Sequence, residues 1–209
     1  PTITSYDYNA LLSEAGDLTP AYFEVRKIIE EKFGKLPELT VKNSEKAAYG
    51  KLELNERCSI FEAAKLLSKP IHSASPQFME DIGQYYGFTL YSTVVDGPRD
   101  EREIKFDAVH DRAVVFIDGE YKGFYERTRD GEPVSFSLKK GESCRIDILC
   151  ENMGRVNYGP HMGDNKGITG VRFGQQLHFG WDMFPLEMDD FTKVPFEKAD
   201  GGVEAASFM

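Results

Sequence analysis

The chain has 209 residues, of which 41% are hydrophobic and 29% charged, and its formal net charge is -10 at pH 7. These values are typical of a globular protein with one substantial domain. The sequence has no run of about 18 apolar residues, so we expect no membrane-spanning helix. The negative charge argues against nucleic acid and anionic membranes as partners, because both would repel the chain. A neutral ligand such as a sugar is compatible with this charge.

The first predicted element is a helix from Pro20 to Phe33. Thr19 is a residue type that caps helices, and proline suits the first helical position, while Gly34 and Pro37 follow the last turn. Apolar residues recur along one face of this helix: Tyr22, Val25, Ile28, Ile29 and Phe33. Such a stripe is too large to remain in water, so we expect it to dock on the β-rich part of the chain or on a second copy of the chain.

Residues 35–70 are interpreted as a connector that lies over a surface, because lysine, glutamate, asparagine and serine dominate its first half. A short extended piece is expected at 48–54 and a helical turn at 59–67. From His72 onward, the sequence changes to short alternating segments separated by turn signals.

Asp118-Gly119 lies between two of these segments and predicts a hairpin, and Lys140-Gly141 predicts a second turn. The expected strands are 88–94, 103–106, 112–117, 121–125, 134–138, 144–150, 168–173 and 176–179. Short strands at this spacing predict a mainly β fold, an antiparallel β-sandwich or jelly roll with peripheral helices.

The segment from Cys144 to Cys150 alternates with period two, so one of its faces should be buried. Both cysteines belong to the same strand, which places their Cα atoms roughly 20 Å apart, whereas a disulfide needs about 4.4–6.8 Å. We therefore expect the three thiols of the chain to fill the core, without a disulfide framework or reactive groups.

A polar, glycine-punctuated loop follows this strand. Asn152 and Gly154 tolerate positive φ, and Arg155 and Asn157 can hydrogen-bond locally. Three interpretations remain open: a self-satisfied loop, a latch to another domain, or a sugar-binding edge. A structural role is favoured, because arginine and asparagine side chains also satisfy exposed backbone carbonyls.

A charged triplet, His110-Asp111-Arg112, directly precedes an apolar strand. Ion pairing at the start of this strand is favoured over a ligand site. Trp181 is interpreted as a core residue in preference to a stacking platform.

The sequence indicates no catalytic or metal centre. His72, His110, His161 and His178 have no metal-binding spacing, so structural roles are favoured over zinc. Neither a nucleotide-binding glycine motif nor a nucleophile elbow is present, and no pair of carboxylates suited to glycoside hydrolysis is evident. No cofactor is predicted.

Six motifs follow one another along about half of the chain: Tyr-Gly-Phe-Thr-Leu-Tyr (86–91), Val-His-Asp-Arg-Ala (109–113), Val-Phe-Ile-Asp-Gly (115–119), Glu-Asn-Met-Gly-Arg-Val-Asn-Tyr-Gly (151–159), Lys-Gly-Ile (166–168) and Trp-x-Met-Phe-Pro-Leu (181–186). Their order closely resembles the β-galactosidases of glycoside hydrolase family 35. Residues 4–10 and 13–19 are similar to the end of that family's catalytic barrel and its final helix.

The resemblance implies a segment of a larger enzyme, because that family joins a (β/α)₈ barrel to galactose-binding-like β-sandwich domains and a barrel takes about 250 residues. It divides the chain into a barrel remnant (1–34), a connector (35–70), the β-sandwich (71–190) and a linker (191–209) toward a further β domain. It also favours an exported protein, periplasmic or extracellular, over a cytoplasmic one.

The family's catalytic glutamates have no counterpart in this chain, so the resemblance implies no catalytic residue here. In the family, a tyrosine of a Tyr-Asp-Tyr motif contacts galactose. By position this is Tyr8, with Tyr6 as the second choice, and Asn9 stands where the family usually has aspartate.

The resemblance therefore implies a non-catalytic segment of a retaining exo-β-galactosidase, which acts on terminal β-galactosyl residues and whose sandwich braces the barrel. The expected partners are the barrel and a further β domain of the same polypeptide. Asn152, Arg155, Asn157, Asp111 and Arg112 are assigned to a structural or interdomain loop. The alternative is a carbohydrate-binding module with its own galactose or oligosaccharide site.

Overall fold

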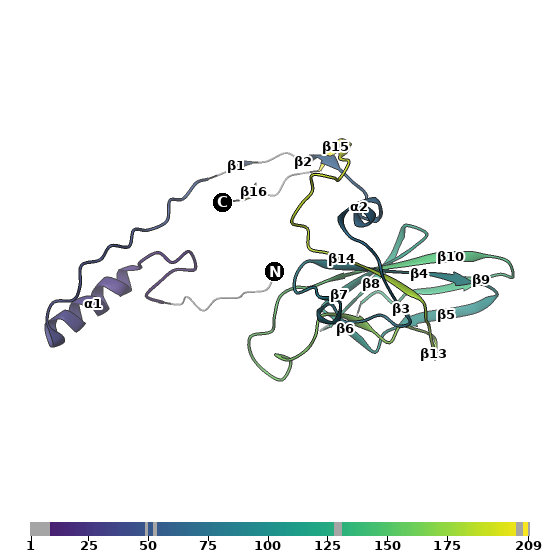
Figure 1. Cartoon of the computed structure of the whole chain (residues 1–209), viewed down its shortest axis with the longest axis horizontal. Helices are drawn as coiled ribbons and strands as arrows, with labels where there is room; N and C mark the ends of the chain where they lie inside the picture. Colours follow the sequence, from purple (N-terminus) through teal and green to yellow (C-terminus); the bar gives the residue numbers. More distant parts are fainter. Residues whose placement is uncertain (1–8, 49, 52–53, 128–130, 204–206, 209) are drawn as a thin grey trace. The chain divides into compact units, whose positions relative to one another are not determined.

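The computed structural model describes residues 9–48, 50–51, 54–127, 131–203 and 207–208. The chain forms two compact units, residues 1–54 with 201–209 and residues 55–200. We call the second unit the β domain. Figure 1 shows the elements of both units. Tyr6 and Tyr8 lie outside the described residues.

The first unit contains helix α1 (Pro20–Phe33) and two short strands, β1 (Gly50–Lys51) and β16 (Ser207–Phe208), which pair antiparallel. The predicted helix is confirmed, but Thr19 does not cap it through its side chain. The Thr19 hydroxyl oxygen lies instead 2.8 and 3.1 Å from the carbonyl oxygens of Ala10 and Leu11, to which it can donate its proton. No residue of α1 is buried.

Six strands of the β domain form one antiparallel sheet, in the order β3-β14-β4-β10-β7-β8. They are β3 (Ile71–Ser73), β14 (Trp181–Leu186), β4 (Phe88–Asp96), β10 (Ser143–Glu151), β7 (Arg112–Ile117) and β8 (Glu120–Glu126). The β7–β8 hairpin turns at Asp118 and Gly119, with φ values of 50° and 83°. These angles fit the predicted Asp-Gly turn, which needs positive φ at both central residues.

The second layer is built from a four-stranded sheet, β13-β12-β5-β9, and a two-stranded sheet, β11-β6. The strands are β13 (Gln176–Leu177), β12 (Arg172–Phe173), β5 (Arg99–Lys105), β9 (Ser135–Leu138), β11 (Gly167–Thr169) and β6 (Ala108–His110). A further pair, β2 (Leu54–Arg57) and β15 (Glu197–Val203), forms a sheet of its own.

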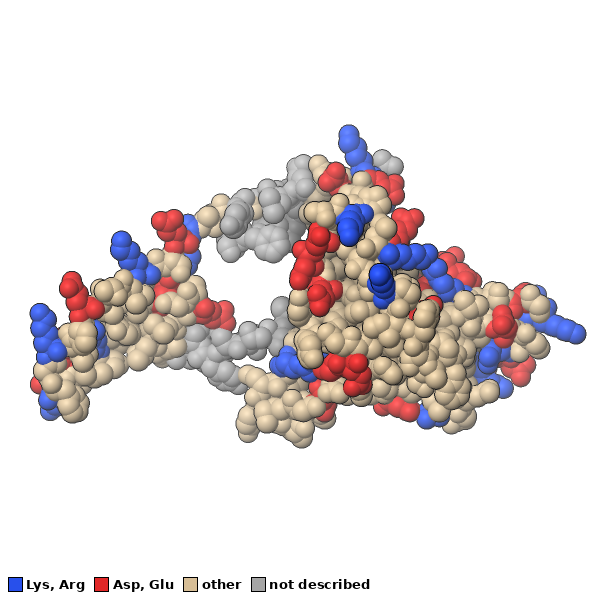
Figure 2. All heavy atoms as spheres, in the orientation of Figure 1, with Lys and Arg blue, Asp and Glu red and all other residues tan. Residues whose placement is uncertain are grey.

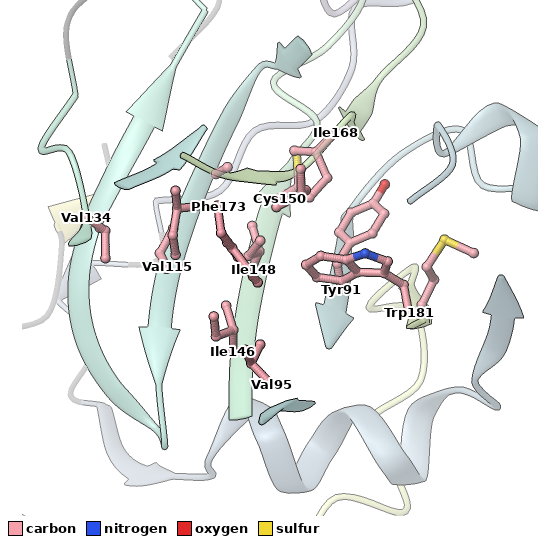
Figure 3. Close-up of a cluster of buried hydrophobic side chains, with 14 of the residues drawn as sticks. Tyr91, Val95, Val115, Val134, Ile146, Ile148, Cys150, Ile168, Phe173 and Trp181 are labelled. Atoms are coloured by element: carbon pink, nitrogen blue, oxygen red, sulfur yellow. The ribbon is translucent and has the colours of Figure 1, made fainter. Parts of the chain in front are cut away.

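The hydrophobic core lies between the two layers and draws side chains from both. Figure 3 shows Ile146, Ile148 and Cys150 along one strand, with Trp181 and Tyr91 beside them. All five are at most 1% exposed. The alternation predicted for Cys144–Cys150 and the core position of Trp181 are thus confirmed. The mainly β, antiparallel fold class is confirmed as well.

Helix α2 (Ile60–Leu67) packs on the outer face of the six-stranded sheet, where Ala64 joins Leu90 and Leu186 in a second apolar cluster. The Phe61 ring meets Phe116 of β7 edge-on, at 5.1 Å between centroids. The helical turn expected at 59–67 is therefore present as a helix of two turns.

The structure differs from the predicted strands at several places. The expected strand 168–173 is divided into β11 and β12 around Gly170, whose φ is 59° and where a Cβ atom would lie 2.0 Å from a carboxylate oxygen of Asp107. Glycine permits this bend and close approach. Strands β3, β6 and β14 were also not expected from the alternation.

Candidate functional site

A cluster of charged side chains holds residues 152–166 against the β domain. We call it the loop anchor, and it consists of Glu80, His110, Asp111, Arg127, Arg155, His161, Asp164 and Lys166. These residues come from the 3-10 turn η1 (Glu80–Ile82), from the end of β6 and the residue between β6 and β7, from the residue after β8, and from the loop itself.

Lys166 and Asp111 form the centre of the loop anchor. Lys166 is 1% exposed, and its Nζ donates to Asp111 Oδ2 at 2.6 Å. The same oxygen accepts the Met153 backbone N–H at 2.9 Å, and Oδ1 accepts from Arg127 Nε at 3.1 Å. A buried ammonium group needs such a partner, because its desolvation would otherwise be very unfavourable.

Asp164 joins the loop to Arg127 and to two histidines. Arg127 Nη1 donates to Asp164 Oδ2 at 2.6 Å, and His161 Nδ1 lies 3.0 Å from the same oxygen. His110 Nε2 is 3.9 Å away, while His110 Nδ1 lies 2.6 Å from the Asn165 carbonyl oxygen. Burial raises the pKa of Asp164, but the hydrogen bonds from Arg127 and His161 outweigh it, so this pKa is below its ordinary value.

Of the predicted loop residues, Asn152 and Arg155 form hydrogen bonds or ion pairs within the β domain. Asn152 Nδ2 donates to the Tyr85 carbonyl at 3.1 Å, and Asn152 Oδ1 accepts the Gly154 N–H at 3.0 Å. Arg155 Nη2 pairs with Glu80, whose carboxylate also accepts the Lys166 backbone N–H. Asn157 is exposed, and its side chain makes no hydrogen bond within the described part of the chain.

Asp111 and Arg112 are neighbours in the sequence but interact with different parts of the β domain. Arg112 Nε lies 3.6 Å from Glu126 Oε1, and its guanidinium carbon is 4.9 Å from the centre of the Phe124 ring on β8. The structure thus places Arg112 with the neighbouring strand and Asp111 in the loop anchor.

Sequence reasoning missed Lys166, Arg127, Asp164 and Glu80 as members of this cluster. Lys166 lies 55 positions from Asp111, and Arg155 lies 75 positions from Glu80. A local pattern cannot report such pairings. The one signal available was the position of Lys166, a lysine directly before the apolar segment that forms β11.

The chemistry available to the described side chains is limited. Hydrogen bonds from neighbouring side chains hold the pKa values of five carboxyl groups below their ordinary range: Asp17, Asp107, Glu120, Asp164 and Asp190. A glycosidase general acid needs a raised pKa. Burial raises the pKa of the Cys144 and Cys150 thiols, which disfavours their thiolates. The described residues contain no group of three or more His, Cys, Asp or Glu that could hold a metal ion.

Acidic and basic side chains are interspersed on the face of the β domain seen in Figure 2. Mixed signs are typical of a solvated protein surface. Across the described part of the chain, no helix has the length and apolar character needed to cross a membrane.

Comparison with known proteins identifies the domain. Residues 76–187 match the family model described as "Beta-galactosidase, first all-beta domain". The chain is 41% identical over 202 residues to a beta-galactosidase of Bos taurus, 39% over 199 residues to one of Homo sapiens, and 33% over 211 residues to beta-galactosidase 17 of Arabidopsis thaliana.

These alignments cover 92%, 91% and 93% of this chain, but only 30%, 28% and 30% of the relatives. The chain therefore spans about 30% of the length of the curated relatives it matches. The family match covers more than half of the chain and includes the loop anchor and every strand of the two layers except β3. The chain thus belongs to the family of β-galactosidase first all-β domains.

Proposed function

We propose that the chain is a non-catalytic segment of a retaining exo-β-galactosidase, and that its β domain braces the catalytic part of the same polypeptide. The observation that carries this proposal is the alignment pattern, in which nearly the whole chain corresponds to less than a third of beta-galactosidase relatives. The remaining length is ample for a separate catalytic domain.

The ionic chemistry of the β domain supports the non-catalytic role. The loop anchor's central carboxylates, Asp111 and Asp164, each bind cationic side chains of the same domain. For Asp164, the hydrogen bonds from Arg127 and His161 hold the pKa below its ordinary value, which keeps this carboxyl group from acting as a proton donor near neutral pH. The cluster is therefore suited to holding the loop in one conformation.

The outer side of the anchored loop supports a contact with the rest of the polypeptide. Tyr158 and Met162 are 85% and 56% exposed, and nearby Tyr85, bonded through its carbonyl to Asn152, is 64% exposed. Aromatic and methionine side chains on a well-supported loop are typical of the centre of a protein interface. Asn157 supplies a side chain that is free to hydrogen-bond across such an interface.

In this proposal, residues 1–34 complete the catalytic barrel, residues 35–70 connect it to the β domain, and residues 191–209 lead to a further β domain. Tyr8 contacts the galactoside in the intact enzyme, with Tyr6 as the second choice. The support for these assignments is the similarity of residues 4–10 and 13–19 to the end of the family's barrel.

The test compares the isolated chain with the full-length enzyme on a chromogenic β-galactoside. The isolated chain is expected to give no turnover. Turnover by the isolated chain that is abolished by mutating one of its own carboxylates would contradict the proposal.

The bracing contact is tested with the double variant Tyr158→Ser, Met162→Ser in the full-length enzyme. We expect its inactivation temperature to fall by several degrees, because the contact holds two domains together, while the isolated chain unfolds as before. Lys122→Ser, at an exposed position on β8, is the matched control. An equal loss of stability in the isolated chain would show that the loop tip serves only the β domain.

A further inference from the structure

A pocket of about 260 Å³ opens on the outer face of the six-stranded sheet, beside α2 and away from the loop anchor. Its lining includes Phe61, Ser92, Arg145, Asp147, Asp182 and Phe184. The pocket mixes aromatic rings with charged and hydroxyl groups, which is the usual composition of a small-molecule site.

The hollow results from the way β14 joins β4. Pairing between these strands begins at Asp182 opposite Ser92, and the preceding residue on the pocket wall is Gly180, which has no side chain. Helix α2 covers the neighbouring part of the same face with Ala64 against Leu90 and Leu186. A sheet face that α2 covers on one side, and that has no paired β14 residue beyond Ser92 on the other, forms a recess.

Asp147 provides a fixed charged group on the pocket wall. Its side chain is 2% exposed, and its carboxylate accepts hydrogen bonds from Ser92 Oγ at 2.6 Å and from Arg145 Nε at 2.7 Å. A carboxylate offers about four lone-pair positions, so two contacts orient it and leave acceptor capacity. Asp182 is about half exposed and pairs with His72 at the rim.

The aromatic side of the pocket is also held in place. The Phe61 ring packs edge-on against Phe116, and the Arg145 guanidinium carbon lies 5.6 Å from the Phe61 ring centre. Phe184 is half-buried on β14. Both rings therefore offer apolar surface beside the polar groups.

We propose that this pocket binds one neutral, polyhydroxylated ring, of the size and chemistry of a hexopyranose. The formal charges that line it are balanced, since Arg145 and Lys65 offset Asp147 and Asp182, and balance favours a neutral ligand. Hydroxyl groups donate to the two carboxylates and accept from Arg145, while the C–H face of the ring packs on Phe61 and Phe184.

The volume limits the ligand to a single ring. Pockets for drug-sized ligands span about 300–1,000 Å³, and this one is slightly smaller. Further units of an oligosaccharide would extend into solvent past Val94, which lines the pocket and is 62% exposed. The site does not depend on the bracing role proposed above, because it lies on a different face and uses different residues.

The experiment is a titration of the ¹⁵N-labelled 209-residue chain with methyl β-D-galactoside, followed by amide shifts. Saturable shifts at millimolar ligand are expected at Ser92, Arg145 and Asp182. Val94→Trp fills the pocket from its exposed rim and is expected to weaken binding at least tenfold. Lys122→Trp, an equally bulky change on exposed β8, is the matched control and should leave the affinity unchanged.

A second variant separates hydrogen bonding from steric blocking. Asp182→Asn retains the side-chain volume but weakens an acceptor, and binding is expected to fall severalfold with unchanged thermal unfolding. The proposal is overturned by an absence of saturable shifts, by shifts that persist in Val94→Trp, or by tighter binding of galacturonate, which would indicate an anion site.

Discussion

Lys166 is a buried lysine whose ammonium group depends on the Asp111 carboxylate. Removing one partner of a buried ion pair leaves the other charge without compensation, which destabilises a protein by about 3–5 kcal/mol. Lys166→Met retains most of the side-chain volume and removes the charge. We expect the free energy of unfolding to fall by about 3 kcal/mol, because Arg127 and the Met153 N–H still bind Asp111. Urea unfolding of the isolated chain measures the change.

Arg155 belongs to the same loop anchor as Lys166, but its charge is exposed and that of Lys166 is buried. Its side chain is 45% exposed, and exposed ion pairs typically contribute less than about 1 kcal/mol. Arg155→Ala should therefore lower the unfolding free energy of the isolated chain by less than about 1 kcal/mol. If Arg155→Ala proved as destabilising as Lys166→Met, stability would not follow the burial of the two charges.

His178 is a partly buried histidine through which the stability of the β domain should depend on pH. Burial lowers its pKa to about 4 from an ordinary 6.5, and the positive charge of Arg99 contributes. Its Nε2 lies 2.9 Å from the Thr93 hydroxyl, which donates its own proton to the Gly180 carbonyl at 2.7 Å. Because that hydroxyl has only one proton to give, the imidazole donates to it from Nε2.

Protonation of His178 in the unfolded chain should weaken the fold at acidic pH. Between pH 6.5 and 4 the unfolded state takes up a proton that the folded state excludes, so stability falls as the pH is lowered. His178→Gln should reduce this loss by about 1.5 kcal/mol, after discounting for the solvent-facing part of the ring. Urea unfolding at pH 7 and pH 4 gives the difference. Parallel pH profiles for the two proteins would contradict this assignment.

At the scale of elements, α1 is notable for its exposed apolar face. Phe23, Ile28 and Phe33 are 51%, 57% and 85% exposed, and no residue of α1 is buried. Surfaces of this kind usually mark an interface.

We therefore expect the isolated chain to self-associate as its concentration rises, and Ile28→Glu to shift it toward the monomer. Sedimentation velocity measures the distribution. Glu31→Gln, an exposed change in the same helix, serves as the control. A chain that stays monomeric at all accessible concentrations would show that α1 does not associate with itself.

Elements with a strong local signal were predictable from the sequence. The period-two alternation of β10 and the Asp118-Gly119 turn depend on residues close in sequence, and both occur as expected. Strand β14 was not predicted, and it contains Pro185, a residue type that is rare in central strands. Its partner β3 pairs only with residues 181–183, so the proline lies beyond the end of β3.

At the scale of the whole molecule, the family could be inferred from ordered motifs, whereas the site could not be assembled from them. Asp111 and the 152–155 segment were identified as unusual, but the hydrogen bonds of Asp111 with Met153, Lys166 and Arg127 join residues 42, 55 and 16 positions apart, which no local pattern reports. The pocket beside α2 was also not predicted, because it depends on where the pairing of β14 with β4 begins and on how α2 covers the sheet. Such features arise from tertiary packing.

The pairing of β3 with β14 has a consequence for how the β domain is made during translation. β3 is the first strand of the six-stranded sheet and β14 the last, yet Ile71 lies opposite Met183, and β14 inserts between β3 and β4. The sheet cannot close until the ribosome has released residue 186. Until then, Tyr91 and the outer edge of β4 lack their partner strand, so the nascent chain exposes an open β edge that favours chaperone binding or mispairing.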